Sequence, residues 1–297
     1  MSNDAVLALL KTILEDGQIL RDEPMKNHTT FRIGGPADFL VLPGTAEQAA
    51  RLVSAFPGLT VVGNGSNLLV GDGGIRGVVM KLCGNFNEVS AHNATLTCQS
   101  GALLSRIAAV ALENGLSGFE FAAGIPGTLG GAVYMNAGAY GGEMKDVVAA
   151  TTYVDNTGQL HKTRDHRFGY RHSRFTGTGD VLLESEILLR HGDRDEIRAR
   201  MTELARRRRD KQPLEYASAG STFKRPEGSF AGALIEQAGL AGYTAGGARV
   251  SEKHCGFVIS DGAATFGDVM AVIRHVQDTV QNKSGVTLEP EVKICGC

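Results

Sequence analysis

The hydrophobic residues of this chain recur in two patterns that alternate along its length. Apolar side chains spaced three and four residues apart predict helices over residues 5–14, 45–56, 103–112, 193–209, 229–238 and 265–280. Short apolar or alternating runs predict strands over residues 39–42, 59–62, 68–70, 77–82, 94–99, 147–155, 181–189 and 286–294. Helices and strands are mixed along the whole chain, which predicts an α+β protein.

Two of the predicted helices carry a starting signal. Thr45 and Gln48 form a possible capping box before the second helix, and Thr265 and Asp268 form one before the last helix. In such a box each side chain accepts a hydrogen bond from the backbone N–H of the other residue. These pairs predict where the two helices begin.

The length of the chain and the order of its elements predict several lobes. A chain of 297 residues is too long for one core of ordinary size. The elements divide into lobes over residues 1–84, 85–192 and 193–288. The last predicted strand would place Glu289 and Glu291 on one face, and residues 289–297 could return to the first lobe.

The composition is that of a globular protein with little charge bias. The chain is 42% hydrophobic and 21% charged, with a net charge of −2, and no apolar run is long enough to span a membrane. The N-terminus lacks the basic segment of a signal peptide. The run Arg206–Arg209 could be read as a nucleic-acid patch, but cations at the end of a helix more often complement its dipole. We therefore expect no nucleic-acid partner and no membrane insertion.

Five cysteines are scattered over the chain and form no C-x-x-C pair. An odd number of unclustered thiols is typical of a reducing cytosol, so we expect a cytoplasmic protein. Cys295 and Cys297 are the only closely spaced thiols, and no histidine clusters with them. The sequence therefore predicts no metal site.

The stretch 118–142, GFEFAAGIPGTLGGAVYMNAGAYGG, is rich in glycine and lacks the polar filler of a linker. Glycine lets the backbone approach a ligand closely, and successive N–H groups can form a concavity for phosphate. Pro126 would rigidify the start of the stretch, while Tyr134 and Asn136 could meet a ligand. The alternative is an ordinary glycine-rich turn between strands.

A second glycine loop covers residues 63–70, GNGSNLLV, directly after a predicted strand. It is not a G-x-G-x-x-G fingerprint, because Leu68 replaces the third glycine and the following residues are typical of a strand. No G-x-x-x-x-G-K-[ST] motif is present either. Two glycine loops that each follow a strand could still hold one pyrophosphate together.

Two further segments carry candidate chemistry. Residues 167–175, RFGYRHSRF, combine arginine with aromatic residues, and arginine pairs well with carboxylate or phosphate. Residues 219–226, AGSTFKRP, place a hydroxyl, a lysine and an arginine close together without forming a G-x-S-x-G elbow. An ordinary charged loop is the alternative for the first segment.

Several motifs, taken in order, resemble one family. They are GNGSNLLV (63–70), GIPGTLGGAVYMNAGAYGGE (124–143), FGYRHSRF (168–175), KQPLEYASAGSTFKRP (211–226), RVSEKHCGF (249–257) and LEPEVK (288–293). The chain resembles the UDP-N-acetylenolpyruvoylglucosamine reductases over nearly its whole length. The resemblance implies a bacterial cytosolic flavoenzyme of peptidoglycan synthesis.

For the fold, the resemblance implies an FAD-binding domain of the vanillyl-alcohol-oxidase type in two lobes, followed by an α+β substrate-binding lobe. No histidine or cysteine in the glycine stretch could tether a flavin, so we expect FAD to be noncovalent. The residues implied to bind it are Gly63, Asn64, Gly65, Ser66, Asn67, Leu68, Gly124, Ile125, Pro126, Gly127, Thr128, Gly131, Asn136, Gly138 and Ala139.

For the activity, the resemblance implies that NADPH reduces the flavin, which then passes hydride to C3 of UDP-N-acetylglucosamine enolpyruvate. Arg171 and Glu291 would bind and polarise the enolpyruvyl carboxylate, and Ser221 would protonate C2. Further substrate contacts are implied for Lys211, Lys224 and Arg225. Taken singly, Ser221 could cap a turn, and Glu291 could be an exposed strand residue. Arg171 could pair with Asp165 or Asp180.

Two features depart from the family pattern. The tyrosine-bearing insertion of one branch is absent, since only residues 176–190 separate FGYRHSRF from the next predicted helix. His254-Cys255-Gly256 replaces the more usual H-A-N sequence.

Two other functions are the alternatives to this reductase activity. One is another FAD-dependent alcohol or sugar oxidoreductase of the same fold, and the other is a flavin-binding protein without catalysis. We expect a monomer.

Overall fold

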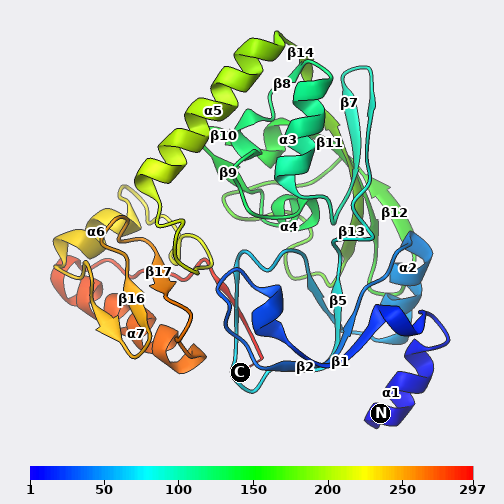
Figure 1. The fold of residues 1–297 in the computed structure, drawn as a ribbon, viewed down its shortest axis with the longest axis horizontal. Helices are drawn as coiled ribbons and strands as arrows, with labels where there is room; N and C mark the ends of the chain where they lie inside the picture. Colours follow the sequence, from blue (N-terminus) through cyan, green and yellow to red (C-terminus); the bar gives the residue numbers. More distant parts are fainter. Residues whose placement is uncertain (297) are drawn as a thin grey trace. The chain divides into compact units, whose positions relative to one another are not determined.

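A computed structural model of the protein describes residues 1–296. The chain divides into two compact units (Figure 1). The first comprises Met1–Arg21, Phe39–Asn64 and Gly77–Arg207, and the second comprises Asp22–Asp38, Gly65–Arg76 and Arg208–Cys297. The chain therefore passes between the units several times, and the division falls within three of its strands and within helix α5 (Arg194–Lys211).

A four-stranded sheet lies in the N-terminal part of the chain. Its order is β1-β2-β5-β3, with β1 (Ile19–Pro24), β2 (Pro36–Val41), β5 (Ile75–Lys81) and β3 (Thr60–Val62). The helices α1 (Asn3–Leu10) and α2 (Ala46–Ala55) contribute Leu10 and Leu52 to a buried cluster with Met80. The apolar stripes that predicted these helices are thus the faces that pack into the core.

A five-stranded antiparallel sheet forms the other part of the first unit. Its order is β12-β11-β13-β7-β6, with β12 (Leu160–Thr163), β11 (Val148–Val154), β13 (Val181–Leu188), β7 (Thr95–Gln99) and β6 (Val89–His92). Helices α3 (Leu104–Glu113) and α4 (Leu129–Tyr134) pack against it (Figure 1). Between them lies a core that includes Leu96, Ile107, Val133 and Phe175.

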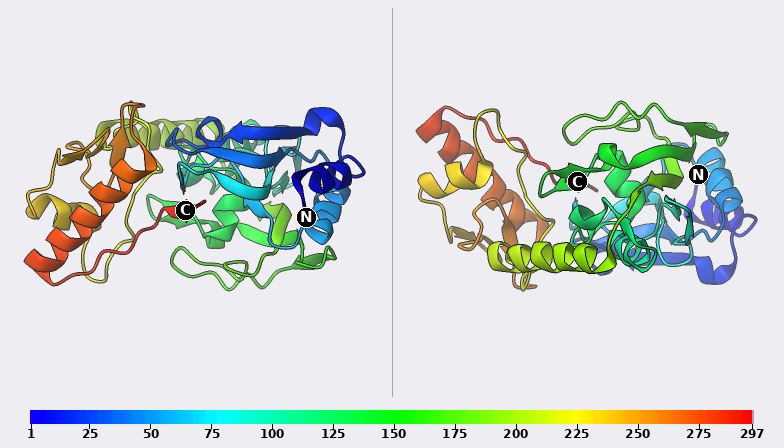
Figure 2. Two further views of the ribbon diagram at one scale, coloured as in Figure 1. Left: turned by 90° about the horizontal axis from the view of Figure 1, so that it is seen from below. Right: turned by 90° about the horizontal axis from the view of Figure 1, so that it is seen from above.

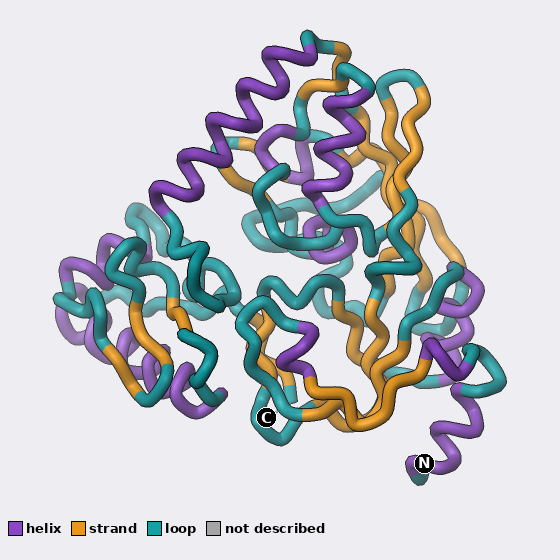
Figure 3. The backbone as a smooth tube through the Cα atoms, viewed as in Figure 1, coloured by secondary structure: helices purple, strands orange, loops and turns teal. Residues whose placement is uncertain are grey.

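Short elements connect these parts of the first unit. They are β8 (Leu116–Ser117) paired with β14 (Arg190–His191), β9 (Gly138–Ala139) paired with β10 (Gly142–Glu143), and the 3₁₀ turns η1 (Asp16–Gln18), η3 (Glu120–Ala122) and η4 (Met144–Asp146). Most of residues 118–128 and 164–180 are turns and loops rather than helix or strand (Figure 3). These loops contain half of the first unit's candidate site residues.

The second unit is built on a small antiparallel sheet and one long helix. The sheet has the order β15-β16-β17, with β15 (Thr244–Ala245), β16 (Ala248–Val250) and β17 (Val258–Ser260). The helix α7 (Phe266–Ser284) packs against this sheet and against α6 (Ala231–Gln237) (Figure 2). Its predicted apolar stripe, which includes Val269, Val272 and Val276, is fully buried.

Two smaller elements complete the second unit. The 3₁₀ turn η2 (Met25–His28) precedes the loop that contributes Phe31 and Ile33 to the unit's core. The strand β4 (Leu68–Val70) pairs in parallel with the C-terminal strand β18 (Lys293–Cys295). Residues 293–295 thus pair with residues 68–70, and the return of residues 289–297 to the first lobe stays a prediction. The three-lobe division at residues 84 and 192 stays a prediction.

The predicted start of α7 is confirmed. Thr265 Oγ1 accepts a hydrogen bond from the N–H of Asp268 at 3.1 Å, and the Asp268 carboxylate accepts one from the N–H of Thr265 at 3.0 Å. At the start of α2 only half of the predicted box forms. Thr45 Oγ1 accepts from the N–H of Gln48 at 3.1 Å, but the Gln48 side chain accepts from the N–H of Gly44 at 2.8 Å.

The predicted strand over residues 286–294 is wrong for most of its length. Only Lys293–Cys295 is a strand, and Pro290 makes an isolated bridge with Phe223. Proline has no N–H to give to a sheet ladder, so a continuous strand through it is unfavourable. Glu289 and Glu291 therefore do not share one face of a strand.

Candidate functional site

The two glycine loops meet in the first unit at Asn64 and Thr128. The side-chain Nδ2 of Asn64 donates a hydrogen bond to the carbonyl oxygen of Pro126 at 2.6 Å. A Cβ atom added at Gly63 would lie only 2.1 Å from Thr128 Oγ1. Glycine at position 63 is therefore required by the close approach of the other loop. The two loops are thus in contact here, and their joint role in holding a pyrophosphate stays a prediction. Gly65 and the residues after it belong to the second unit.

We expect Gly63→Ala to lower the flavin content of the purified protein, because the new methyl group would push Thr128 and its loop out of place. Small-to-large changes of this kind cost about 1–3 kcal/mol. Gly73→Ala is the matched control, since a Cβ at Gly73 would meet nothing within 4 Å. The flavin absorbance per protein, measured at equal concentration, compares the two variants. Full flavin content in Gly63→Ala would show that the loops can separate without consequence.

The backbone of the glycine stretch has the donors that an FAD site needs. Among residues 1–296, the N–H groups of Gly127, Thr128 and Gly131 have no hydrogen-bond acceptor in the protein. A Cβ added at Gly131 would meet nothing within 4 Å, so space beside the backbone is open there. Unpaired N–H groups beside open space fit the pyrophosphate or the polar edge of a flavin. The residues present therefore fit the cofactor.

Asn136 has a different environment from its neighbours in the stretch. Its side chain is buried, and both ends of the amide are bonded within the protein: to Glu143, to the carbonyl of Gly169 and to the N–H of Lys145. Both N–H donors of the side-chain amide are thus used within the protein, and its oxygen already accepts one hydrogen bond. Any contact of this residue with the flavin would involve its backbone.

In the second unit, Ser221 and Glu291 lie on neighbouring segments. The N–H of Glu291 donates to the carbonyl of Thr222 at 2.8 Å, and the N–H of Lys224 donates to the carbonyl of Glu289 at 2.8 Å. Asn67 of the second glycine loop donates from Nδ2 to the carbonyl of Glu291 at 3.2 Å. The segment after Gly65 is therefore bonded directly to Glu291 and, through the Glu291–Thr222 hydrogen bond, linked to the segment of Ser221.

Ser221 is half-buried, and its hydroxyl donates a long hydrogen bond of 3.3 Å to the carbonyl of Phe223. A Cβ added at Gly256 would lie 3.5 Å from Ser221 Oγ and 3.0 Å from the ring of His254. Burial lowers the pKa of His254, and the charge of Lys211 lowers it further. The departure at residues 254–256 from the family sequence thus lies directly beside the predicted proton donor.

Two of the three other residues predicted to bind the substrate contact side chains of the second unit. Lys224 Nζ forms an ion pair with Glu289 at 2.9 Å. The Arg225 guanidinium lies 4.0 Å from the centre of the exposed Phe230 ring. Lys211 is exposed at the end of α5. All three roles stay predictions.

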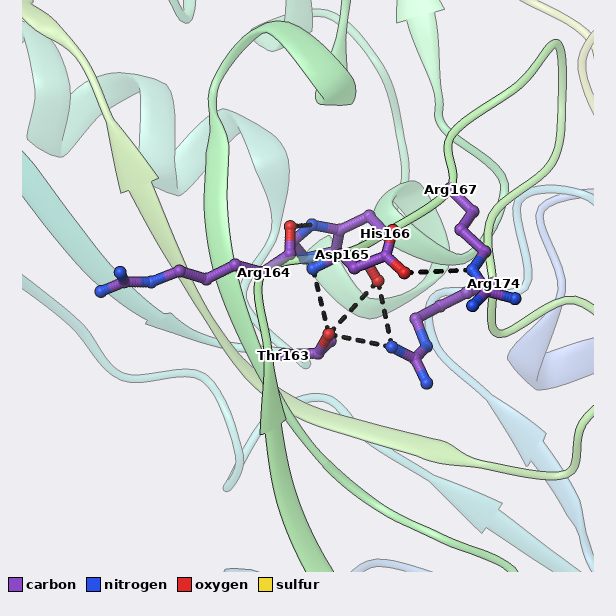
Figure 4. A network of polar contacts seen from close by, with 6 residues as sticks. All are labelled: Thr163, Arg164, Asp165, His166, Arg167 and Arg174. Atoms are coloured by element: carbon purple, nitrogen blue, oxygen red, sulfur yellow. Dashed lines mark hydrogen bonds and ion pairs between the residues drawn. The ribbon is translucent and has the colours of Figure 1, made fainter.

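In the first unit, Arg171 lies within the loop of residues 164–180. A network of polar contacts joins Thr163, Asp165, Arg167 and Arg174, which lie within and beside this loop (Figure 4). Arg174 Nη1 donates to Thr163 Oγ1 at 2.9 Å and to the carbonyl of Asp165 at 3.2 Å. The Asp165 carboxylate pairs with Arg167 at 3.0 Å, and this arginine holds the pKa of Asp165 below its usual range. Asp165, which the sequence offered as a partner for Arg171, is thus bonded to another arginine of the same loop.

His166 is a buried part of this loop that the sequence gave no reason to single out. Its Nε2 lies 2.9 Å from Thr151 Oγ1, and its Nδ1 lies 3.2 Å from the carbonyl oxygen of Arg164. Thr151 Oγ1 in turn lies 2.9 Å from Ser185 Oγ. Burial lowers the pKa of His166, the Arg164 carbonyl opposes this effect, and the nearby charge of Arg174 adds to it. The ring is therefore held neutral between strands β11 and β13 and the loop.

We expect His166 to make the first unit less stable in mild acid. Because its pKa is lower in the folded than in the unfolded chain, the contribution to stability is complete above about pH 6.5 and is lost as the pH falls through the folded value. Urea unfolding at pH 7.5 and pH 5.5 measures this loss. His166→Gln cannot titrate, so it should show a smaller difference between the two pH values. An equal difference in both proteins would contradict this assignment.

The predicted site residues belong to two sets. The first unit holds Gly63, Asn64, Gly124, Ile125, Pro126, Gly127, Thr128, Gly131, Asn136, Gly138, Ala139 and Arg171. The second holds Gly65, Ser66, Asn67, Leu68, Lys211, Ser221, Lys224, Arg225 and Glu291. Sequence reasoning gave no role to Glu143 or His166, although Glu143 closes one of the quoted motifs.

Family models match both parts of the chain. An FAD binding domain model matches residues 37–164, and a model of the C-terminal domain of UDP-N-acetylenolpyruvoylglucosamine reductase matches residues 212–295.

Among the helices of residues 1–296, none combines the length and the hydrophobicity that a membrane span requires.

Curated relatives match over the full length. The UDP-N-acetylenolpyruvoylglucosamine reductase of Clostridioides difficile is 50% identical over 303 residues, covering 100% of this chain and 99% of the relative. The enzyme of the same name from Caldanaerobacter subterraneus subsp. tengcongensis is 50% identical over 294 residues, covering 97% of each chain.

Solved structures agree. The UDP-N-acetylenolpyruvylglucosamine reductase of Thermus caldophilus superposes with a TM-score of 0.81 at 35% identity, covering 93% of this chain and 98% of that chain. The grass pollen allergen Phl p 4, which has glucose dehydrogenase activity, reaches a TM-score of 0.51 at 15% identity, covering 64% of this chain and 44% of that chain. The second likeness concerns the fold alone.

Proposed function

The chain belongs to the UDP-N-acetylenolpyruvoylglucosamine reductase family, and we propose that it reduces UDP-N-acetylglucosamine enolpyruvate to UDP-N-acetylmuramate with NADPH as reductant. Identity of 50% over the whole chain supports this proposal. The observation that carries it is local: the segment of Ser221 is hydrogen-bonded to that of Glu291, and Asn67 of the glycine loop donates to the Glu291 carbonyl. These bonds support a site that uses the proposed acid, Glu291 and the proposed flavin loop together.

FAD, when bound, accepts hydride from NADPH and delivers it to the substrate. We propose that the N–H groups of Gly127, Thr128 and Gly131 hold it, together with the loop residues 63–68. Phosphate and flavin oxygens are acceptors, and these backbone groups are donors without a partner among residues 1–296. No side chain of the glycine stretch offers a histidine or cysteine for a covalent bond.

The roles of the protein's residues follow from the movement of charge in the substrate. When hydride adds to C3, the electron pair of the C2=C3 bond moves to C2 and the adjoining carboxylate. We propose that the Arg171 guanidinium offsets this charge and that Glu291 helps to orient the carboxylate. The hydroxyl of Ser221 gives its proton to C2, and the serine oxygen then takes back a proton from solvent. A serine is acidic enough only against a strongly basic carbanion in a site that excludes water.

The test is an absorbance experiment on the purified protein. We expect a flavin spectrum, bleaching by NADPH without oxygen, and return of the colour when UDP-N-acetylglucosamine enolpyruvate is added. Acid precipitation should leave the flavin in the supernatant. Bleaching by an alcohol or a sugar, with no return of the colour when the enolpyruvyl sugar is added, would favour another oxidoreductase of this fold. A protein that never bleaches would favour a flavin-binding protein without catalysis.

We also propose that the enzyme acts as a cytoplasmic monomer in peptidoglycan precursor synthesis, and so in cell wall formation, cell shape and cell division. Free thiols at Cys83, Cys98, Cys255 and Cys295 support a reducing compartment. Light scattering coupled to size exclusion measures the oligomeric state, and a mass of twice 31.4 kDa would contradict the monomer.

A further inference from the structure

Arg171 lies at the tip of a tight turn. The N–H of Gly169 donates to the carbonyl of His172 at 3.0 Å, and the N–H of His172 donates back to the carbonyl of Gly169 at 3.3 Å. Arg171 occupies the third position of this turn with a φ of 52°, in the left-handed region that favours glycine or asparagine. A bulky residue stays in such a conformation only when its surroundings fix it. The hydrogen bonds at the base of the turn therefore help to hold Arg171 in this conformation.

Asn136 holds the base of this turn. Its Nδ2 donates to the carbonyl of Gly169 at 3.0 Å, and its Oδ1 accepts from the N–H of Lys145 at 2.9 Å. The residue is 1% exposed and itself has a φ of 46°, a conformation that asparagine tolerates well. A buried amide with both ends bonded spans from the glycine stretch to the arginine loop.

The second donor bond of Asn136 fixes a carboxylate near Arg171. Its Nδ2 donates to Glu143 Oε2 at 2.9 Å, and the same carboxylate pairs with Lys145 at 2.8 Å. These contacts lower the pKa of Glu143, and the charge of Arg171 lowers it further. A Cβ added at Gly138 would lie 2.7 Å from Glu143 Cγ, so the glycine there makes room for this side chain. The Glu143 carboxylate is thus bonded to the same Nδ2 that holds the base of the Arg171 turn.

We propose that Asn136, together with the Glu143 carboxylate that it holds, is a positioning residue for Arg171. Asn136 fixes the backbone of the turn through Gly169, and the same side chain holds the Glu143 carboxylate beside the base of that turn. The inference rests on the proposed function for what Arg171 binds. The anchoring of the turn itself does not depend on that function.

The test uses Asn136→Asp, which keeps the size of the side chain but replaces the Nδ2 donor with an acceptor facing two other acceptors. Losing a buried hydrogen bond of this kind corresponds to about a tenfold effect. We expect amide hydrogen exchange in residues 165–176 to be about tenfold faster, and kcat/KM for the enolpyruvyl substrate to fall at least tenfold through KM. Asn93→Asp is the matched control, since Asn93 is exposed and has a similar φ of 52°.

A double-mutant cycle separates positioning from general damage. If Asn136 acts through Arg171, Asn136→Asp should cost little further activity in an Arg171→Met background. An equal cost in both backgrounds, unchanged exchange in residues 165–176, or loss of flavin together with activity would overturn the proposal. If the wild-type protein does not reduce the enolpyruvyl sugar, the proposed function fails, while the exchange comparison still decides whether Asn136 anchors the turn.

Discussion

Ser221→Ala is expected to leave bleaching by NADPH at the wild-type rate and to slow the return of colour with the enolpyruvyl substrate by about 10²–10⁴-fold. NADPH oxidation needs no proton at C2 of the sugar ether, whereas reduction of the ether builds negative charge there. The only change is the loss of one half-buried hydroxyl, whose 3.3 Å hydrogen bond to Phe223 contributes little to folding. The two half-reactions should therefore separate.

Stopped-flow absorbance of the flavin measures both steps in one instrument. Ser218→Ala is the matched control, because it removes a hydroxyl three residues earlier in the same segment. The control should behave as wild type in both steps. Colour returning at the wild-type rate in Ser221→Ala would mean that the proton comes from another group, and His254, beside Gly256, would be the next residue to change.

Local signals predicted much of the fold. The box at Thr265 and Asp268 and the valine stripe of α7 lie within a few residues of one another, so the pattern contains all the information that fixes the helix. The same holds for α3, which ends at Asn114 before Gly115 with a φ of 62°. Such helices can be predicted from their own residues without information about the rest of the chain.

What the pattern could not predict depends on distant partners. Residues 286–292 have the composition of a strand, but Pro290 interrupts the ladder and the neighbouring N–H of Glu291 bonds to an irregular segment around Thr222. The side-chain oxygen of Gln48 accepts hydrogen bonds from the N–H of Gly44 and from Nε2 of Gln18, which lies 30 residues away. It therefore does not accept from the N–H of Thr45. Neither outcome can be predicted from the spacing of apolar and polar residues near these positions.

The candidate site shows the same limit. The motifs identified Ser221, Arg171 and Glu291 singly, but they could not tell that Ser221 and Glu291 lie on hydrogen-bonded segments. Nor could the sequence separate Asn136, whose amide is used inside the protein, from the loop residues whose N–H groups have open space beside them. Burial decides between these roles, and burial is a property of the folded chain.

The largest expected loss of stability is that of Phe175→Ala, about 3–5 kcal/mol in the free energy of unfolding of the first unit. Phe175 is fully buried, and the centre of its ring lies 5.1 Å from that of Tyr153 in an edge-on arrangement. Phe175 directly follows Arg174, which donates a hydrogen bond to Thr163. Removing it leaves a cavity under the loop of Arg171, because the surrounding β11 and β13 side chains can collapse only partly.

Urea unfolding followed by circular dichroism measures this loss for Phe175→Ala. Leu160→Ala, at a side chain 62% exposed on β12 of the same sheet, should change stability by no more than about 0.5 kcal/mol. The loop should also loosen, so hydrogen exchange over residues 165–176 should quicken in Phe175→Ala and not in the control. Equal stability in the two variants would mean that the first unit's core does not depend on this ring. The rigidity of the Arg171 turn would then have to come from Asn136 and its polar partners alone.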